Sequence, residues 1–473
     1  MQVSSNRMAA IDNPQYASAA RIVARLRSSG HQAYFAGGCV RDLLLGRAPQ
    51  DYDVATSATP DDVVAMFPKT FTVGAHFGVV LVVDDIARTN AQADDVAQEV
   101  ATEVATFRND GSYSDGRHPD AVRFSSDPRE DVFRRDFTIN GMLLDPSVLQ
   151  STGDPASAVL DFVGGIDDLR DRMIRAIGDP YRRFDEDKLR MLRAIRFAAR
   201  LRFRIDHSTF AAIQRLAPEI AQVSCERVRD ELTLILTEGG ARTGLDLLDA
   251  SGLLREVLPE AVRMQGVAQP PEFHPEGDVW VHTLLLLDKL PAGCPATLAW
   301  GALLHDIGKP ATFRAPQSPG DRIRFNGHVE VGVRIAQQIC HRLRFSNEDT
   351  AQIAALVANH MRFGDVMKMK QSTLKRFLRL PEFEQHLALH RMDCLSAHGD
   401  LTLYDFAKRE FETTPEEQVS PPLLVTGRDL IAAGYKPGPQ FKTMLELAED
   451  AQLEGRIATT EEGLRLLQNT FPG

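Results

Sequence analysis

The stretch GGCVRDLLLGRAPQDYDVAT, residues Gly37–Thr56, decides how the N-terminal part of this chain is expected to fold. The apolar run before it predicts a strand ending at the glycines, CVRDLLLG predicts a helix, and DYDVAT predicts a second strand. A Gly-Gly turn lets backbone N–H groups approach an anion such as a phosphate. Asp51 and Asp53 alternate with Tyr52, so a strand would carry both carboxylates on one face, which suits Mg²⁺. Together, the glycine turn and the pair of aspartates predict a site for a metal-bound nucleoside triphosphate. Each of these two features alone is more often a plain turn or loop.

Length and composition indicate a globular protein of several domains. The chain has 473 residues, of which 43% are apolar and 25% charged. No apolar run is long enough to span a bilayer, and the first residues lack the apolar core of a signal peptide. The five cysteines are odd in number and far apart, which is typical of reduced thiols and excludes a disulfide framework. We therefore expect a cytoplasmic protein that makes no membrane contact.

The character of the sequence changes along the chain. The first 150 residues alternate predicted helices and strands, with a polar, acidic loop at DIARTNAQADDVAQ. After Asp161, helical periodicity dominates to the C-terminus. Pro270-Pro271 and residues 415–422 are the clearest boundary signals.

A net charge of −11 argues against a nucleic-acid partner, but the charge is unevenly distributed. Residues 170–204 hold twelve Lys or Arg against five Asp or Glu, a surplus of seven positive charges. This surplus fits an anion-binding surface as well as it fits an ordinary solvated helix face.

The same region predicts an amphipathic helix with a row of arginines. Arg190, Arg193, Arg196 and Arg200 fall within about 120° of arc at 100° per residue. Asp187 precedes Arg190 by three positions, so we expect both side chains on one helix face. A carboxylate acceptor beside a guanidinium donor can read the polar edge of a base, although an ordinary surface helix would show the same spacing.

Further motifs follow in order: RRDFTIN at 134–140, E-D-x-x-R at 186–190 and ERVRDEL at 226–232. With the Gly-Gly-x-x-Arg-Asp and D-x-D elements, they make nearly the whole chain resemble the bacterial-type (class II) CCA-adding tRNA nucleotidyltransferases and bacterial poly(A) polymerases. The resemblance implies an α+β N-terminal nucleotidyltransferase (polymerase-β-like) head on a mixed sheet. An all-α neck, a body containing an HD domain, and a tail would follow.

The resemblance also implies roles for individual residues. Asp51 and Asp53 match the family's Mg²⁺ ligands, and Glu103 matches an auxiliary carboxylate. The positions that match nucleotide-contacting residues are Gly38, Arg41, Arg135, Asn140, Asp187, Arg190, Arg193 and Arg196. The implied substrates are ATP and CTP, and the implied partner is tRNA; the sequence carries no sign of an obligate protein partner.

A second constellation combines histidines with aspartates in the later half of the chain. Its members are His282, His305, Asp306, His328, His360 and Asp393. A lone helical histidine is usually structural, but imidazoles and carboxylates that recur on successive predicted helices suit a divalent metal and can lower the pKa of bound water. The pattern resembles the HD phosphohydrolases. The resemblance implies that His328 and His360 are the extra ligands found in two-metal members, and that Lys309 contacts the phosphate of the substrate. This implies hydrolysis of phosphomonoesters or 2′,3′-cyclic phosphates with a divalent metal of unknown identity.

The resemblance predicts four parts. They are a nucleotidyltransferase head at 1–150, a helical neck with the base-reading helix and RNA-binding region at 151–265, an HD domain at 266–400, and a tRNA-contacting tail at 401–473. CCA addition is the leading interpretation, because the place where poly(A) polymerases carry a basic stretch reads TVGAHFGVV. Poly(A), A-only or CC-only addition stays open. So does a protein of another class, an HD phosphohydrolase acting on nucleotides or RNA ends whose first domain merely holds RNA.

Overall fold

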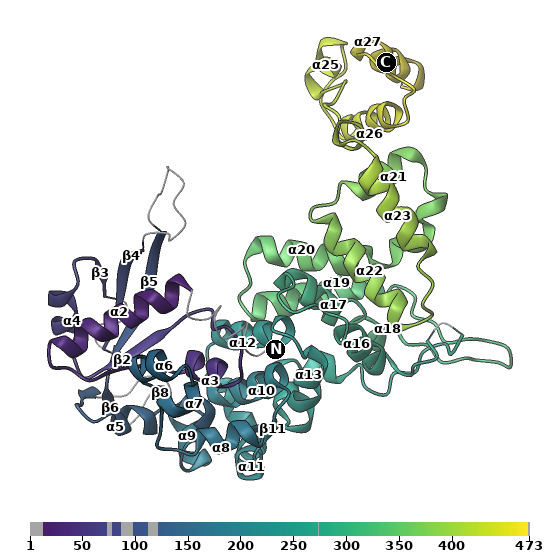
Figure 1. Cartoon of the computed structure of the whole chain (residues 1–473). Coiled ribbons are helices and arrows are strands. Elements are labelled where there is room, and N and C mark those ends of the chain that lie inside the picture. The colour runs from purple at the N-terminus through teal and green to yellow at the C-terminus, as the bar shows by residue number, and fades with distance from the viewer. Residues whose placement is uncertain (1–12, 73–77, 87–97, 112–121, 273, 472–473) are drawn as a thin grey trace. The chain divides into compact units, whose positions relative to one another are not determined.

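The computed structural model describes residues 13–72, 78–86, 98–111, 122–272 and 274–471 (Figure 1). The chain forms two compact units. Unit 1 comprises Met1–Ile235 and Asp246–Val257, and unit 2 comprises Leu236–Leu245 and Leu258–Gly473. Among the described residues, no helix combines the length and the apolar character needed to cross a membrane.

Unit 1 is built on a seven-stranded mixed sheet with strand order β3-β4-β5-β2-β1-β8-β9. Its strands are β1 (Ala33–Ala36), β2 (Asp53–Thr56), β3 (Thr70–Phe71), β4 (Val79–Ile86), β5 (Gln98–Thr106), β8 (Met142–Leu144) and β9 (Val159–Asp161). β2 and β5 run parallel, and the other neighbouring pairs are antiparallel. Helix α2 (Pro14–Ser28) packs against β1, β2 and β5. The predicted mixed sheet is confirmed. The predicted loop covers residues 85–98; its first two residues and its last one belong to β4 and β5, and the remainder lies outside the described residues, as does much of the TVGAHFGVV stretch.

The stretch Gly37–Thr56 folds nearly as predicted. Helix α3 (Gly38–Leu44) follows β1, and α4 (Pro60–Met66) begins at a capping box between Thr59 and Asp62. β2 begins only at Asp53, so Asp51 precedes the strand that DYDVAT predicted. The alternation nevertheless persists, because Tyr52 is buried and its ring packs 5.3 Å from that of Phe35.

The rest of unit 1 is mostly helical, as predicted. Its helices are α5 (Pro128–Phe133), η2 (Thr138–Asn140), α6 (Pro146–Thr152), α7 (Pro155–Ala158), α8 (Gly165–Arg170), α9 (Pro180–Glu186), α10 (Leu189–Leu201), α11 (His207–Leu216), η3 (Ala217–Gln222), α12 (Cys225–Thr237) and α14 (Leu253–Val257). Two small two-stranded sheets pair β6 (Arg108–Asp110) with β7 (Val122–Phe124) and β10 (Met173–Ile174) with β11 (Arg204–Ile205). Helix α10 buries its apolar residues and carries the predicted row of arginines.

Unit 2 consists of helices joined by irregular connections in its described residues. It contains α15 (Pro259–Val262), α16 (Val279–Leu287), α17 (Ala296–Leu304), α18 (Lys309–Thr312), α19 (His328–Arg342), α20 (Asn347–Asn359), η4 (His360–Lys368), α21 (Gln371–Leu378), α22 (Phe383–Ser396), α23 (Thr402–Thr413) and α24 (Glu416–Val419). Helix α13 (Ala241–Ala250) contributes residues to both units. The chain ends in α25 (Gly427–Ala432), α26 (Gln440–Leu453) and α27 (Thr460–Thr470). Helix α17 packs against α16, α20 and α22, and its Trp300 is fully buried. This packing brings distant histidines together.

Candidate active sites

Two neighbouring strands of unit 1 bring carboxylates together. Val54 of β2 pairs in register with Val104 of β5, so Asp53 and Glu103 occupy the preceding position of each parallel strand. Both valines are buried, and side chains alternate along a strand, so the two acids lie on the other face. Asp51 lies two residues before Asp53, close enough for its charge to act on the Asp53 carboxyl. The structure thus brings together the three acids that the sequence analysis singled out.

The charge on these acids is poorly compensated. The pKa of Asp53 rises from 3.8 to about 6, because burial and the nearby charges of Asp51 and Glu103 disfavour its ionised form. Arg135 acts in the opposite direction. Three carboxylates that repel one another form an all-oxygen donor set, and a hard divalent cation relieves that repulsion. The residues therefore fit a Mg²⁺-type ion.

The glycine pair allows the backbone to come close to charged side chains. Gly37 has φ +75°, and a Cβ there would lie 3.3 Å from Nη1 of Arg135 and 3.7 Å from Oδ2 of Asp53. A Cβ on Gly38 would lie 3.5 Å from Nη2 of Arg41. Arg41 is buried, and its Nη1 donates a hydrogen bond of 2.8 Å to Oδ1 of Asn140. Four predicted nucleotide-contacting or metal-ligating residues thus surround one turn.

Arg135 is held by a buried acid that the sequence analysis did not single out. Asp131 is 0% exposed and accepts hydrogen bonds from Arg134 (2.6 Å) and Arg135 (2.9 Å). Burial would raise the pKa of Asp131, but the two guanidiniums outweigh it and lower the pKa. The signal was present in the sequence, because Asp131 precedes the arginines by three and four positions, the spacing of helical neighbours.

The expectation that Asp187 shares a helix face with Arg190 is wrong. Asp187 follows α9 in an extended conformation (φ −152°, ψ 106°), and α10 begins only at Leu189. The reason is local, because Oδ1 of Asp187 accepts a hydrogen bond of 3.0 Å from the Leu189 N–H at the start of the helix. Its Oδ2 accepts one of 2.8 Å from Arg227. The two residues still lie close, since the Arg190 N–H donates to the Asp187 carbonyl at 3.1 Å.

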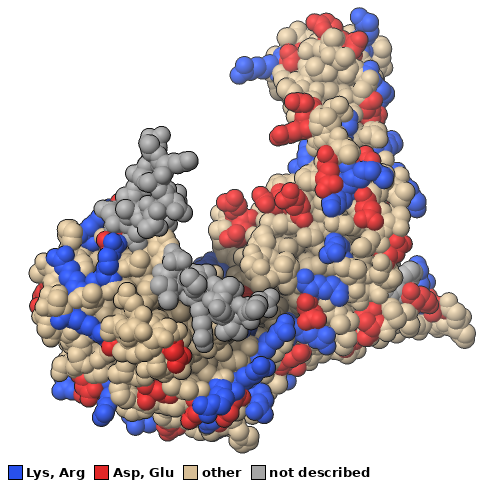
Figure 2. Space-filling model, in the orientation of Figure 1, with Lys and Arg blue, Asp and Glu red and all other residues tan. Residues whose placement is uncertain are grey.

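The arginines of α10 are bound to acids and do not form a uniformly basic surface. Asp136 accepts from Arg193 at 2.8 Å and from Asn140 at 3.2 Å, which links the helix to the turn that holds Arg41. Glu231 of α12 contacts Nε of Arg196 at 2.8 Å. Further ion pairs in the region 170–204 are Arg183–Glu186, Arg190–Glu186, Lys188–Asp185, Arg175–Asp206 and Arg170–Asp167. Figure 2 likewise shows positive and negative side chains interspersed over the visible surface.

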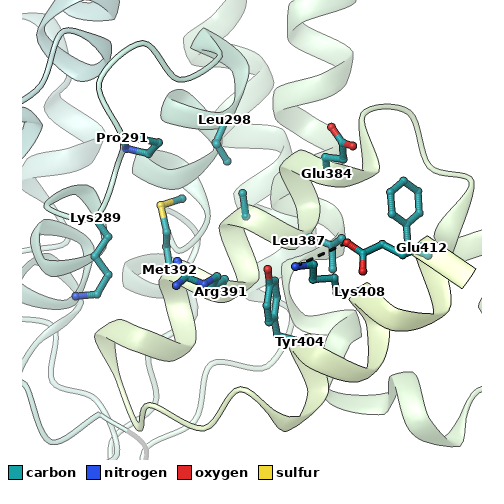
Figure 3. A pocket seen from close by; sticks show the side chains of 12 residues that line it. Lys289, Pro291, Leu298, Glu384, Leu387, Arg391, Met392, Tyr404, Lys408 and Glu412 are labelled. Carbon is teal, nitrogen blue, oxygen red and sulfur yellow. Dashed lines mark ion pairs between the residues drawn. The ribbon is translucent and has the colours of Figure 1, made fainter.

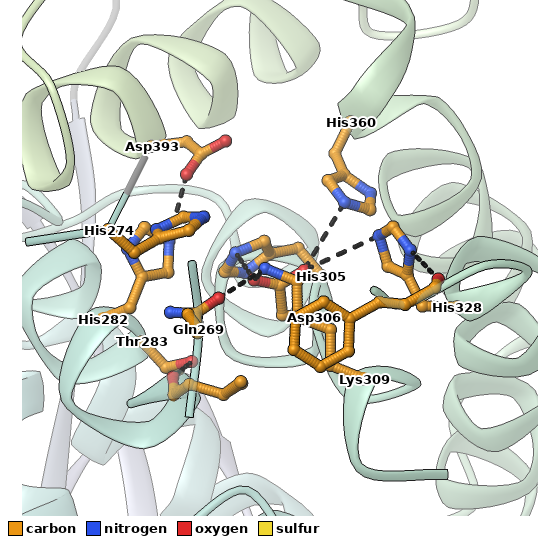
Figure 4. A network of polar contacts seen from close by, with 12 residues as sticks. Gln269, His274, His282, Thr283, His305, Asp306, Lys309, His328, His360 and Asp393 are labelled. Carbon is orange, nitrogen blue, oxygen red and sulfur yellow. Dashed lines mark hydrogen bonds and ion pairs between the residues drawn. The ribbon is translucent and has the colours of Figure 1, made fainter. Parts of the chain in front are cut away.

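Unit 2 brings together all six residues of the predicted histidine constellation (Figure 4). They come from α16, from the turn after α17, from the first residues of α19 and η4, and from α22. Ligand atoms within 4.8 Å of one another form two groups, His282–His305–Asp393 and Asp306–His328–His360. Figure 4 shows Asp393 facing His282, while His360 and His328 face Asp306.

The outer ring nitrogen of each histidine is fixed by a hydrogen bond. Nδ1 of His305, His328 and His360 lies 2.7–2.9 Å from the backbone carbonyl oxygens of Ala302, Phe325 and Val357 respectively. Because a carbonyl only accepts, Nδ1 carries the proton in each case. In the neutral ring, Nε2 then presents a lone pair toward the centre of the site.

The inward-facing atoms meet carboxylate oxygens. Nε2 of His282 lies 3.0 Å from Asp393, and Nε2 of His305, His328 and His360 lies 3.2, 3.9 and 3.6 Å from Asp306. A lone pair and a carboxylate are both acceptors, so these contacts need a cation or a proton between them. The mixed nitrogen and oxygen donors suit a transition metal or Mg²⁺. The residues therefore fit a divalent metal.

Protonated groups offset the negative charge of the two aspartates in the cluster. Burial would lower the pKa of His282, but hydrogen bonds with Asp393 and with the carboxylate of Glu276 outweigh it and raise the pKa to about 9. The pKa values of Asp306 and Asp393 are lowered despite burial, by Lys309 and His305 for the first and by His282 and His305 for the second. Metal binding at this site is therefore expected to release protons.

Known families match most of the chain. The sequence matches the Poly A polymerase head domain over residues 33–175, the "probable RNA and SrmB- binding site of polymerase A" over residues 202–264, and the HD domain over residues 279–395. A CCA-adding enzyme of Levilactobacillus brevis is 37% identical over 451 residues, covering 95% of this chain and 96% of the relative. The chain belongs to the class II CCA-adding enzyme family.

Other relatives match over different lengths. A CCA-adding enzyme of Geobacillus stearothermophilus is 41% identical over 240 residues, covering 51% of this chain. The chain thus spans 54% of the length of that relative. It likewise spans about half the length of three other CCA-adding enzymes that it matches. The crystal structure of a Bacillus stearothermophilus CCA-adding enzyme in complex with CTP has a TM-score of 0.70 and 26% identity, covering 97% of this chain and 98% of the other.

Two residues of the histidine cluster were missed in the sequence. Oε1 of Glu276 lies 2.6 Å from Nδ1 of His282 and 2.9 Å from Nδ1 of His274, and the three could together hold a metal. Glu276 orients His282 as the backbone carbonyls orient the other rings. Both missed residues precede position 279, where the match to the HD family begins, and lie in an irregular segment without periodicity. Their only signal is a His and a Glu shortly before His282.

A pocket of about 450 Å³ lies beside the cluster on the same helix (Figure 3). Its lining comes from the connection after α16, from α17, and from α22 and α23: Lys289, Pro291, Leu298, Glu384, Leu387, Ala388, Arg391, Met392, Tyr404, Lys408, Phe411 and Glu412. Arg391 and Met392 directly precede Asp393 in the sequence, but none of the six cluster residues lines the pocket. The pocket is therefore separate from the histidine cluster.

Proposed function

We propose that this chain adds C, C and A to the 3′ end of tRNA, using CTP and ATP at the carboxylate site. The observation that carries the proposal is the convergence of Asp51, Asp53 and Glu103 beside the Gly37–Gly38 turn. Membership of the CCA-adding enzyme family supports it. Two Mg²⁺ ions would lower the pKa of the RNA 3′-hydroxyl and stabilise the pyrophosphate leaving group.

The protein's own residues would hold and orient the substrates. Asp51 and Asp53 would hold the metal ions, and Glu103 would support them from β5. Arg41 and Arg135 would offset charge on the triphosphate. Both guanidiniums are already ordered, because Asn140 binds Arg41 and Asp131 binds Arg135. The site would thus require little reorganisation when the triphosphate arrives.

Base choice would rest on Asp187 and Arg190, with Arg193 and Arg196 as further nucleotide contacts. A carboxylate and a guanidinium offer an acceptor and donors to the base edge, and the wrong base would leave one of them unpaired. Arg227 and Glu186 hold the two side chains before a base binds. The protein, and not a nucleic-acid template, would then select C or A.

The division into head, neck, HD domain and tail at the predicted boundaries belongs to the same proposal. The tail would contact the elbow of tRNA, and the enzyme would act in the cytoplasm. These placements rest on the family and not on geometry.

Nucleotide incorporation into one tRNA transcript that ends before CCA tests the proposal. Purified protein with Mg²⁺ is given CTP alone, ATP alone and both, and the 3′ ends are sequenced. We expect two C residues with CTP alone, and C, C, A followed by a stop with both. Long A tails would instead indicate a poly(A) polymerase, and addition of A only to a CC end would indicate an A-adding enzyme.

We propose a second activity, hydrolysis of phosphomonoesters or 2′,3′-cyclic phosphates at the histidine cluster. The observation that favours it is the inward orientation of four Nε2 atoms onto two aspartates. A bound divalent metal would supply an activated water. Hydrolysis of p-nitrophenyl phosphate and 2′,3′-cyclic AMP, with Mg²⁺, Mn²⁺, Co²⁺ or Ni²⁺, is the test. We expect turnover that Asp306→Asn abolishes and Asp51→Ala leaves intact; turnover insensitive to Asp306→Asn would refute the assignment.

A further inference from the structure

An irregular segment, residues 313–327, joins α18 to α19 and begins and ends at the histidine cluster. In Figure 1 this connection extends away from the neighbouring helices. It starts four residues after Lys309, whose Nζ contacts Asp306 at 2.7 Å, and it ends directly before His328. Whatever binds along the segment is therefore positioned relative to the cluster.

The segment carries positive charge that the described residues neutralise only in part. Arg314 and Arg324 lie directly opposite each other and exchange both backbone hydrogen bonds, of 3.0 and 3.1 Å. Like charges at directly opposed positions of an antiparallel pair are destabilising. Asp321 is the segment's only acid and pairs with Arg324 at 2.7 Å. Arg314 and Arg322 are exposed and form no ion pair within the described part of the chain. An anion would relieve this arrangement.

An aromatic pair connects the arginines to the cluster. Phe313 is 40% exposed, and its ring centroid lies 6.0 Å from that of Phe325. Nζ of Lys309 lies 5.4 Å from the centre of the Phe325 ring, and the Phe325 carbonyl accepts the hydrogen bond from Nδ1 of His328. The exposed ring of Phe313 is thus held at a fixed position relative to Lys309, the residue that the resemblance places near phosphate.

We propose that residues 313–327 bind single-stranded RNA and present its 3′ end to the histidine cluster, so that the hydrolase substrate is an RNA end and not a free mononucleotide. Exposed aromatic rings that stack bases, combined with arginines that follow the backbone, are how proteins bind single strands. A mononucleotide has a single phosphate, which the cluster itself would take. Arg314 and Arg322 would contact phosphates further along the strand. This inference rests on the proposed hydrolase activity.

The first test compares how the full-length protein hydrolyses an oligonucleotide and a mononucleotide. The substrates are a pentaribonucleotide ending in a 2′,3′-cyclic phosphate and 2′,3′-cyclic AMP, and the variant is Arg314→Ala/Arg322→Ala. We expect kcat/KM for the oligonucleotide to fall at least tenfold, and that for cyclic AMP to stay within twofold. Arg334→Ala, an exposed arginine of α19, is the matched control and should change neither. A drop below twofold for the oligonucleotide, or an equal drop for both substrates, would overturn the inference.

A binding measurement separates failure of this inference from failure of the hydrolase proposal. Anisotropy of a labelled pentaribonucleotide with a 3′-phosphate is recorded in EDTA at several salt concentrations. We expect at least tenfold weaker binding by the double variant, and a slope of log affinity against log salt smaller by about 1.4. If the wild type hydrolyses neither substrate, this result still supports RNA binding, whereas equal affinity and slope in variant and wild type refute it.

Discussion

The carboxylate site of unit 1 and the histidine cluster of unit 2 both gather acidic oxygens, but they compensate negative charge differently. On the sheet, burial and the nearby charges of Asp51 and Glu103 raise the pKa of Asp53 to about 6. In unit 2, Asp306 and Asp393 face imidazoles and Lys309, and their pKa values fall. The histidine cluster can therefore balance itself with protons, whereas the carboxylate site depends on an added cation.

The two sites also orient their nitrogen-bearing side chains by different means. Buried acids fix the guanidiniums of unit 1, as Asp131 fixes Arg135. In unit 2, backbone carbonyls and Glu276 fix the rings of the histidines. Removing an orienting group should therefore destabilise the fold around the first site and weaken metal binding at the second.

The largest expected effect is a reciprocal loss of the two activities. Asp51→Ala removes a carboxylate that we propose holds metal, so we expect nucleotide incorporation to fall by at least about a thousandfold, which corresponds to several kcal/mol of lost transition-state stabilisation. Phosphate-ester hydrolysis should stay within twofold. Asp306→Asn should give the opposite pattern. Both rates are measured on the same preparations; a variant that loses both activities would show that the sites do not act separately.

The second effect concerns stability of unit 1. Asp131→Ala leaves Arg134 and Arg135 without their buried partner, and we expect a loss of about 3 kcal/mol in the free energy of unfolding. Urea titration followed by circular dichroism measures it, and KM for CTP should rise. Asp167→Ala is the control. Asp167 forms an ion pair with Arg170 at the same spacing of three positions, but the Asp167 side chain is 74% exposed. It should change stability by less than about 1 kcal/mol; equal losses in both variants would contradict the argument.

Strand alternation made the carboxylate site predictable. The buried Tyr52 between Asp51 and Asp53 places the acids on one side, although β2 starts two residues later than predicted. Helical spacing failed at Asp187, because a hydrogen bond to the Leu189 N–H holds that residue outside α10. A local side-chain bond of this kind overrides periodicity and cannot be read from spacing alone.

The histidine cluster was predictable only in part. Residues such as His305 and Asp306 were found because they match a family pattern. Periodicity could not bring α16, α19 and α22 together, since that depends on how the helices pack around α17. Glu276 was missed because it lies in an irregular segment and acts through His282. Its role follows from a distance that only the folded chain shows.

The third prediction tests whether Glu276 orients His282. Glu276→Gln leaves the volume but weakens the charge-assisted bond to Nδ1, so we expect metal affinity to fall about 10- to 100-fold. Zn²⁺ competition with a chromogenic chelator measures it, in an Asp51→Ala background that weakens metal binding at the carboxylate site. Glu272→Gln, an exposed residue of the same segment, is the control. Unchanged affinity in Glu276→Gln would remove Glu276 from the site.

The smallest effect is a pH dependence that belongs to the carboxylate site alone. The folded protein raises the pKa of Asp53 from 3.8 to about 6, so this residue's stabilising contribution is complete below pH 3.8 and is lost as the pH rises through about 6. A rise from 3.8 to about 6 corresponds to about 3 kcal/mol, which solvent screening of this partly exposed carboxylate reduces to about 1–2 kcal/mol. In EDTA at pH 7.5, the free energy of unfolding of Asp53→Asn should therefore exceed that of the wild type by about 1–2 kcal/mol, and the difference should vanish near pH 4. Mg²⁺ binds the ionised carboxylate, so adding it should reverse the order at pH 7.5. Parallel stability curves for the two proteins between pH 4 and 7.5 would mean that neither burial nor the neighbouring acids raise the pKa of Asp53, and the contrast between the two sites would fail.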